Sequence, residues 1–239
     1  MKVLKLNLVI LFIFGFTHAC FTQNSKNGKV VYKAILAKFD DKKGKSLSYL
    51  NDLIEDNDSL HFELLFNKNE SVFKIINSLN KDDSDLEFSK ILLGGRYVYY
   101  NSKNEKPIYQ IQAYGEFFLV NYDIPKWTLI NEKKKIGNYL CYKASTTKVV
   151  RNSRGTFNNE VTAWYTNEVP ISYGPRGYFG LPGLILELQE KNKIYVAKSI
   201  NLNLSDVDIN KPKKGKNLTQ QEFENIGIKM DEERFSKSK

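Results

Sequence analysis

Short segments rich in β-branched and aromatic residues recur along most of this 239-residue chain. Polar or glycine-containing turns separate them, a pattern typical of antiparallel β-proteins. The segments expected to form strands are residues 29–38, 60–66, 70–77, 96–101, 107–114, 116–123, 127–130, 139–150, 160–166, 184–190 and 193–202. A twisted sheet with so many strands must curl, close or divide into two layers. We therefore predict a mainly β (α+β) fold with one strongly curved, half-barrel-like antiparallel sheet of about ten strands, and a closed up-and-down β-barrel is the alternative.

A proline–glycine turn precedes an expected strand that is apolar on both faces. In Leu181-Pro182-Gly183-Leu184, proline at the second position fixes φ near −65° and glycine at the third accepts positive φ, as a type II turn requires. The strand that follows is expected to be buried on both sides. The motif contains no titratable or nucleophilic side chain, so we interpret it as a structural corner. Its residues are Gly180, Leu181, Pro182, Gly183, Leu184 and Ile185.

The same part of the chain carries a wider set of motifs. They are Trp127, residues 136–144, residues 163–166, Pro170, Gly174-Pro175 and residues 180–186. In order and spacing these motifs resemble the GLPGLI family, secreted proteins typical of Bacteroidota to which no biochemical function is assigned. The resemblance implies export and a β-rich fold, and it implies no catalytic residue.

One domain is expected to span residues 29–202. A helix predicted over residues 46–54 has its leucines at helical spacing and would plug the curved sheet. Residues 203–239 are expected to form a basic tail with a short helix at 219–226, where Thr219 and Glu222 have the spacing of a capping box.

The N-terminus has the pattern of an export signal. Residues 1–19 contain two lysines, a short apolar run and a small residue at the end, which predicts a cleaved signal peptide. Residues 17–20 form a weak lipobox, so Cys20 is a candidate lipid anchor, and ordinary cleavage is the alternative. We expect a periplasmic or outer-membrane-associated protein, or else an extracellular one, with no membrane-spanning segment in the mature chain.

Side chains suited to catalysis are scarce. His61, beside Glu63 on one strand face, is the only histidine after the signal, and Cys141 is the only cysteine after Cys20. None of the common hydrolase, zinc, redox or phosphate-loop motifs is present, and the acidic residues 80–87 lack EF-hand spacing. We therefore predict a protein that is not an enzyme, with no catalytic residue, cofactor or metal ligand. The net charge of +9 comes mostly from dispersed lysines, which favours a solvated surface over nucleic-acid binding.

Aromatic residues make up 13% of the chain and cluster in the expected strands. On a concave face they would line a site for an apolar or sugar-like ligand, although such residues also fill the cores of β-proteins. The leading hypothesis is an exported binder or carrier of an apolar ligand or a lipoprotein. The alternative is an envelope assembly protein that docks a protein partner through the GP and GLPG turns, because tyrosine and arginine dominate interface energies. The candidate binding surface comprises Trp164, Tyr165, Tyr173, Arg176 and Tyr178.

Overall fold

The fold is built on a single curved sheet. The computed structural model describes residues 27–36, 61–76, 93, 96–103, 106–123 and 125–237. Within them lies a 12-stranded sheet with the order β12-β6-β5-β4-β3-β2-β1-β11-β10-β9-β8-β7. The strands are β1 (Asn27–Leu36), β2 (His61–Phe66), β3 (Glu70–Ile76), β4 (Tyr97–Asn101), β5 (Ile108–Ala113), β6 (Glu116–Asn121), β7 (Thr128–Ile136), β8 (Tyr139–Asn152), β9 (Gly155–Thr166), β10 (Leu184–Glu190), β11 (Lys193–Leu204) and β12 (Lys216–Thr219). Residues 1–19, Cys20, the helix predicted at 46–54 and the acidic residues 80–87 lie outside the described residues.

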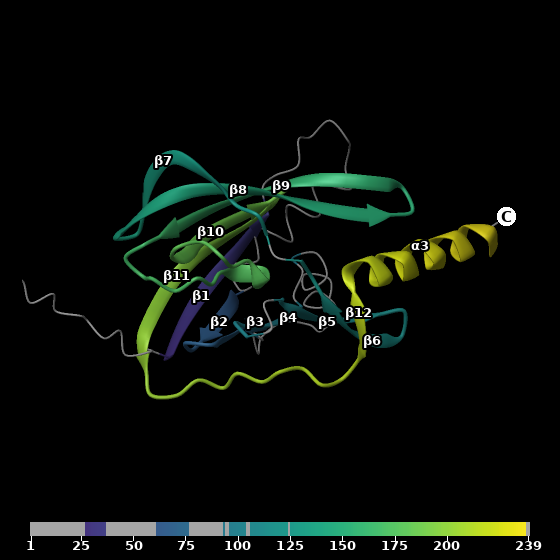
Figure 1. Ribbon diagram of the computed structural model, residues 1–239, viewed down its shortest axis with the longest axis horizontal. Helices are drawn as coiled ribbons and strands as arrows, with labels where there is room; N and C mark the ends of the chain where they lie inside the picture. Colours follow the sequence, from purple (N-terminus) through teal and green to yellow (C-terminus); the bar gives the residue numbers. More distant parts are fainter. Residues whose placement is uncertain are drawn as a thin grey trace, which may run out of the picture.

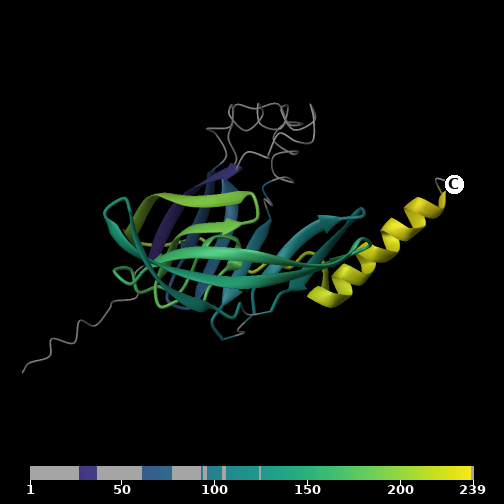
Figure 2. The ribbon, with the colours of Figure 1, turned by 90° about the horizontal axis from the view of Figure 1, so that it is seen from above.

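The sheet bends back on itself without closing. Figure 1 shows β7, β8 and β9 above, and β5, β6 and β12 below. Seen from above in Figure 2, β8 and β9 form a long hairpin that reaches toward helix α3 (Gln220–Lys237). The two edge strands, β7 and β12, stand at opposite ends of the strand order. The half-barrel prediction is confirmed, and the closed-barrel alternative is wrong.

Alternation along the strands decides which side chains enter the interior. On β2, Phe62, Leu64 and Phe66 are buried while His61 and Glu63 are partly exposed, as the two-residue period of a strand requires. In the interior, the ring of Phe62 stacks on that of Phe73 with centroids 5.3 Å apart. Tyr195 packs edge-on against both rings. Aromatic side chains therefore fill the interior of the curved sheet.

The connection between β9 and β10 crosses the concave side. We call residues 167–183 the plug segment; it includes the 3-10 turn η2 (Pro175–Gly177), which contacts β3 and β4. Its Tyr173 ring lies 6.0 Å from the ring of Phe66 and 5.9 Å from that of Tyr100. Phe179 approaches Tyr100 to 4.2 Å between ring centroids. The plug segment therefore ties one half of the curved sheet to the other.

The predicted type II turn at the GLPG motif requires correction. Gly183 does not have a positive φ, whereas Gly180 has φ 92°. Gly183 is needed for a different reason, since a Cβ atom there would lie 2.0 Å from the backbone oxygen of Thr166 in β9. Leu184 then donates its N–H to the carbonyl of Val169 at 2.9 Å, at the start of β10. The motif is a corner, as expected, but it depends on the close approach of two backbones.

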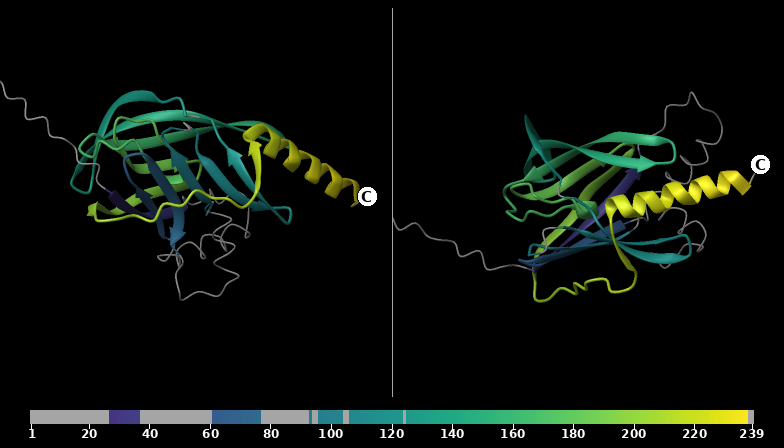
Figure 3. Two further views of the ribbon diagram at one scale, coloured as in Figure 1. Left: turned by 60° about the horizontal axis from the view of Figure 1, so that its bottom comes forward. Right: turned by 45° about the vertical axis from the view of Figure 1, so that its right-hand side comes forward.

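The C-terminal residues join the sheet. The segment after β11 runs along the lower side of the molecule (Figures 1 and 3), where the carbonyls of Asn210 and Lys214 accept hydrogen bonds from Tyr97 and Gln110. It ends in β12, an unpredicted four-residue strand that runs parallel to β6. The predicted capping box opens α3, with Thr219 N–H donating to Glu222 at 2.8 Å and Glu222 N–H donating to Thr219 Oγ1 at 3.2 Å. None of the described helices has the length and apolar character needed to cross a membrane.

Candidate binding cleft

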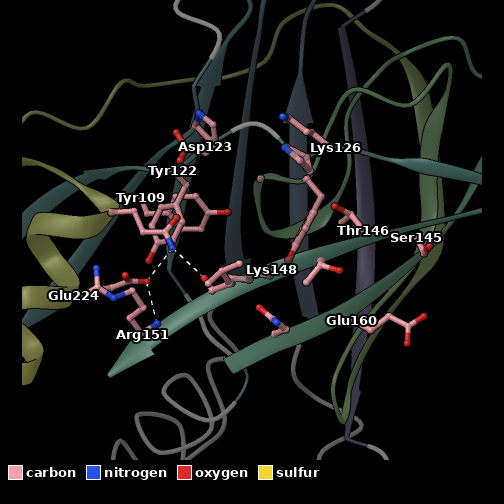
Figure 4. Close-up of a pocket in the computed structure, with 18 of the residues that line it drawn as sticks. Tyr109, Tyr122, Asp123, Lys126, Ser145, Thr146, Lys148, Arg151, Glu160 and Glu224 are labelled. Carbon is pink, nitrogen blue, oxygen red and sulfur yellow. Dashed lines mark hydrogen bonds between the residues drawn. The ribbon is translucent and has the colours of Figure 1, made fainter. Parts of the chain in front are cut away.

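A cleft of about 850 Å³ opens between the β8–β9 hairpin and the β5–β6 side of the sheet (Figure 4). Tyrosine rings, hydroxyl and amide groups, and charged side chains of both signs form its lining. The residues include Pro107, Tyr109, Tyr122, Asp123, Lys126, Ser145, Thr146, Lys148, Arg151, Asn158, Glu160, Tyr178, Gln220 and Glu224. This volume is typical of small-molecule sites, but the lining is much more polar than that of a lipid-binding cavity.

Two tyrosines of the cleft are held in place by the structure around them. Tyr109 in β5 is buried, and its hydroxyl donates a 2.5 Å hydrogen bond to the backbone oxygen of Arg176. Its ring packs against Tyr122, with centroids 4.2 Å apart, as Figure 4 shows near α3. Tyr178 lies 5.9 Å from Trp127, ring centroid to ring centroid. Trp127 is itself fixed by a 2.8 Å bond from its indole N–H to the backbone oxygen of Phe179.

Behind these rings lies a buried network centred on Glu190. Glu190 Oε1 accepts a hydrogen bond from Lys148 Nζ at 3.0 Å, and Oε2 accepts one from the Tyr178 hydroxyl at 3.3 Å. Arg176 Nη1 lies 3.2 Å from Oε2 as an ion pair. Burial by itself would raise the pKa of Glu190, but the charges of Arg176 and Lys148 hold this pKa below its usual value. The carboxylate therefore stays ionised at neutral pH and anchors the cleft to β10.

The backbone at Arg176 is unusual. Its φ of 57° and ψ of 27° lie in the left-handed region, which a residue other than glycine adopts at a cost of about 1–2 kcal/mol. Gly177 follows with φ 73°. Strained residues of this kind persist when their surroundings determine them, and they concentrate at functional sites. Arg176 is only 8% exposed as a residue, and here the strained turn brings its guanidinium to Glu190.

Cationic side chains crowd around this single carboxylate. Burial, followed by the charge of Arg176, lowers the pKa of Lys193 to about 8, with further contributions from Arg96 and Lys148. Burial also lowers the pKa of Lys148, while Glu190 opposes that shift. Positive charge is therefore concentrated around Glu190 at neutral pH.

Most residues of the candidate binding surface are buried, including Tyr173, Arg176 and Tyr178 around the GP and GLPG turns. Tyr165, Tyr173, Arg176 and Tyr178 are buried, and only Trp164 is partly exposed. Trp164 and Tyr165 are neighbours on β9 and point to opposite faces of the strand. Lys134 Nζ lies over the Trp164 ring, 4.4 Å from the ring centroid. The GP turn is also interior, because Gly174 and Pro175 are buried. Of the five, Tyr178 lines the cleft and Arg176 supports it from behind.

Several residues of the cleft were not predicted. Lys148 and Glu190 lie 42 positions apart and meet only because β8 and β10 flank β9 in the sheet. Tyr109 and Tyr122 lie in expected strands, but neither was predicted as a site residue. Their alternation within short strands was the available signal, but it does not say which rings face a cleft and which fill the core.

The side chains considered for catalysis lie elsewhere. Cys141 is buried, and burial raises the pKa of its thiol to about 11. Glu63, the expected partner of His61, pairs instead with Lys29 at 2.7 Å and Lys74 at 3.4 Å. Within the described part of the chain, no group of three or more His, Cys, Asp or Glu side chains is arranged to hold a metal ion.

Sequence comparison places part of the chain in a known family profile. Residues 127–187, which contain β7, β8, β9, the plug segment and the start of β10, match a family described as "Protein of unknown function (Porph_ging)". This match does not carry the GLPGLI name. It agrees with the inference that the motif-bearing region resembles proteins of unknown function. No curated protein is significantly similar to this chain.

Two solved structures of PNGF-II resemble the fold. One has a TM-score of 0.50 and 14% identity, and covers 85% of this chain and 33% of that chain. The other has a TM-score of 0.48 and 18% identity, with 82% of this chain and 31% of that chain covered. This chain therefore spans about a third of the length of the PNGF-II chains. At such low identity the likeness concerns the fold alone.

Proposed function

We propose that this chain is an exported, non-enzymatic binding protein that holds its ligand in the cleft between the β8–β9 hairpin and the β5–β6 side of the sheet. The observation that carries the proposal is the fixed wall of the cleft. The hydroxyls of Tyr109 and Tyr178 are bonded to the plug segment and to Glu190, so both rings are positioned before a ligand arrives. A preformed site avoids part of the ordering cost of binding.

The lining points to an amphipathic ligand more than to a purely apolar one. Tyrosine rings offer apolar area, while Thr146, Lys148, Asn158 and Glu160 offer hydrogen-bonding and charged groups. The interior of the curved sheet is filled by aromatic side chains such as Phe62, Phe73 and Tyr195. An acyl chain would thus have to lie in a polar cleft. We favour a ligand that combines a ring-like apolar face with several polar groups.

Export is the second component of the proposal. It is supported by the signal-like pattern of residues 1–19 and by the resemblance to a secreted family. We do not retain docking of a protein through the GP and GLPG turns, because the side chains assigned to that surface are buried.

Native mass spectrometry of the protein purified from its own cell envelope tests the proposal. We expect a co-purifying small molecule bound at one copy per chain. Thr146→Trp, which fills the cleft, should abolish this complex, whereas Thr156→Trp, at an exposed position near the tip of the same hairpin and outside the cleft lining, should retain it. Loss of the ligand from both variants, or retention in both, would contradict the assignment of the cleft.

A further inference from the structure

A second cavity, of about 290 Å³, adjoins the cleft next to α3. Tyr122, Lys148 and Arg151 line both cavities, so a ligand in the cleft would lie beside this smaller space. Its lining holds four basic side chains, those of Arg96, Lys148, Arg151 and Arg176. The two acidic side chains in the lining are those of Glu224 and Asp231.

The two acidic side chains of the lining form no ion pair with its basic side chains among the described residues. Glu224 accepts hydrogen bonds from Gln220 Nε2 at 2.9 Å and from the backbone N–H of Arg151 at 3.4 Å. Asp231 accepts one from Ser153 Oγ at 2.7 Å. Within the described residues, the ion pairs of the cluster are those of Lys148 and Arg176 with the single carboxylate of Glu190. Among the described residues, four basic side chains therefore face three carboxylates, those of Glu190, Glu224 and Asp231.

Arg176 adds an independent observation. Its side chain is 10% exposed, and the residue lines the cavity. Nη1 lies within ion-pair distance of Glu190, but the contact lacks hydrogen-bond alignment, and this buried atom has no hydrogen-bond partner. Buried polar groups are nearly always bonded, so this guanidinium N–H, in a residue that lines the cavity, still has the capacity to donate to an acceptor that approaches it. The planar guanidinium suits the oxygen atoms of phosphate, sulfate or carboxylate groups.

We propose that this cavity binds an anionic group, a phosphate, sulfate or carboxylate, of the ligand whose remaining part lies in the cleft. The proposal rests on the proposed function for the remaining part of the ligand, but anion binding itself can be measured separately. Arg96, Lys148, Arg151 and Arg176 contact the anion from the lining of the cavity.

The test uses the full mature protein and inorganic phosphate as the probe, with sulfate and acetate as further arms. Thermal unfolding is followed at pH 7 and constant ionic strength, with chloride as the reference anion. We expect saturable stabilisation by at least one of the three oxyanions and none by chloride. The oxyanion that stabilises most identifies the class of the anionic group. Stabilisation no greater than that of chloride in all three arms overturns the proposal.

Two arginines of one hairpin provide a matched pair of variants. Arg151→Gln removes a charge from the cavity lining, whereas Arg154→Gln removes the same charge at an exposed position outside it. We expect Arg151→Gln to weaken oxyanion binding about tenfold and Arg154→Gln less than twofold. Equal weakening would mean a general effect of net charge and would overturn the site. Lys148→Met, a third variant, should also weaken oxyanion binding, because it removes another charge from the cavity lining.

The outcomes separate this inference from the proposed function. Oxyanion binding with no ligand in the cleft supports the anion site and contradicts the cleft as the ligand site. A neutral ligand in the cleft without oxyanion binding supports the proposed function and contradicts the anion site.

Discussion

Replacing Gly183 by alanine tests the close approach of the GLPG corner to β9, where the plug segment ends and β10 begins. An added Cβ atom would lie 2.0 Å from the backbone oxygen and 2.6 Å from the carbonyl carbon of Thr166. Even close C–H contacts place carbon about 3.3 Å from oxygen, so one backbone would have to move by more than about 1 Å. Thr166 pairs with Leu184 in the sheet, and Gly183 is held next to that pair as the residue before β10. The atoms closest to the added Cβ belong to the backbone, so no flexible side chain can move aside to relieve the clash.

The expected cost follows from the contacts that this displacement disturbs. Overpacking in a well-packed interior costs about 1–3 kcal/mol. The neighbouring bonds from Leu184 N–H to Val169 and from Ile185 N–H to Tyr173 are 2.9 and 3.0 Å long, and weakening one of them adds about 1 kcal/mol. A total of about 2–4 kcal/mol corresponds to a fall in melting temperature of roughly 5–15 °C for a domain of this size.

Circular dichroism melts of Gly183→Ala and Gly227→Ala provide the assay and its control. At Gly227 in α3, an added Cβ would meet only the Tyr114 hydroxyl at 3.2 Å, the far end of a flexible side chain. This variant should melt at or slightly above the parent temperature, because alanine favours a helix. A Gly183→Ala protein that melts within about 2 °C of the parent would refute the close approach of the two backbones.

Three further predictions concern charge and processing. Glu190→Gln leaves the buried charge of Arg176 without its partner and should lower the free energy of unfolding in urea by about 3–5 kcal/mol. Glu187→Gln, at a partly exposed ion pair, should lower it by at most about 1 kcal/mol. Equal costs would contradict the network around Glu190. The pKa of Lys193 is lowered to about 8, so from pH 8 to 10 the unfolded chain keeps a proton that the folded protein loses. The free energy of unfolding should therefore rise with pH in that window, by up to about 1.4 kcal/mol per unit, and Lys193→Met should remove the rise; an unchanged slope would argue against the depressed pKa. The intact mass of the mature chain decides the fate of Cys20, since a diacylated or triacylated mass indicates a lipid anchor and a mass without acyl groups removes that hypothesis.

Local patterns predicted local structure well. Alternation along residues 61–66 gave the buried face of β2, and the spacing of Thr219 and Glu222 gave the first turn of α3. These features depend on neighbours within a few positions. The curvature of the sheet was also predictable, because the number of strands leaves a twisted sheet few other shapes.

Long-range contacts were beyond such patterns. Arginine is rarely buried, so nothing local indicated that Arg176 would be buried against Glu190. The need for glycine at position 183 arises from Thr166, a contact made by folding and not by the turn itself. The parallel pairing of β12 with β6 joins segments about a hundred positions apart, and four residues carry too little pattern to predict it.

A crystal structure of the protein purified from its own cells, without refolding, is the most direct test of the cleft as the ligand site. We predict electron density for a bound molecule against Tyr109 and Tyr178, with an acidic group within hydrogen-bonding distance of Lys148 and Arg176. A ligand bound elsewhere, such as against Trp164, which lies outside the cleft lining, would contradict it. So would a β8–β9 hairpin that closes on β5 and β6 and leaves no cleft.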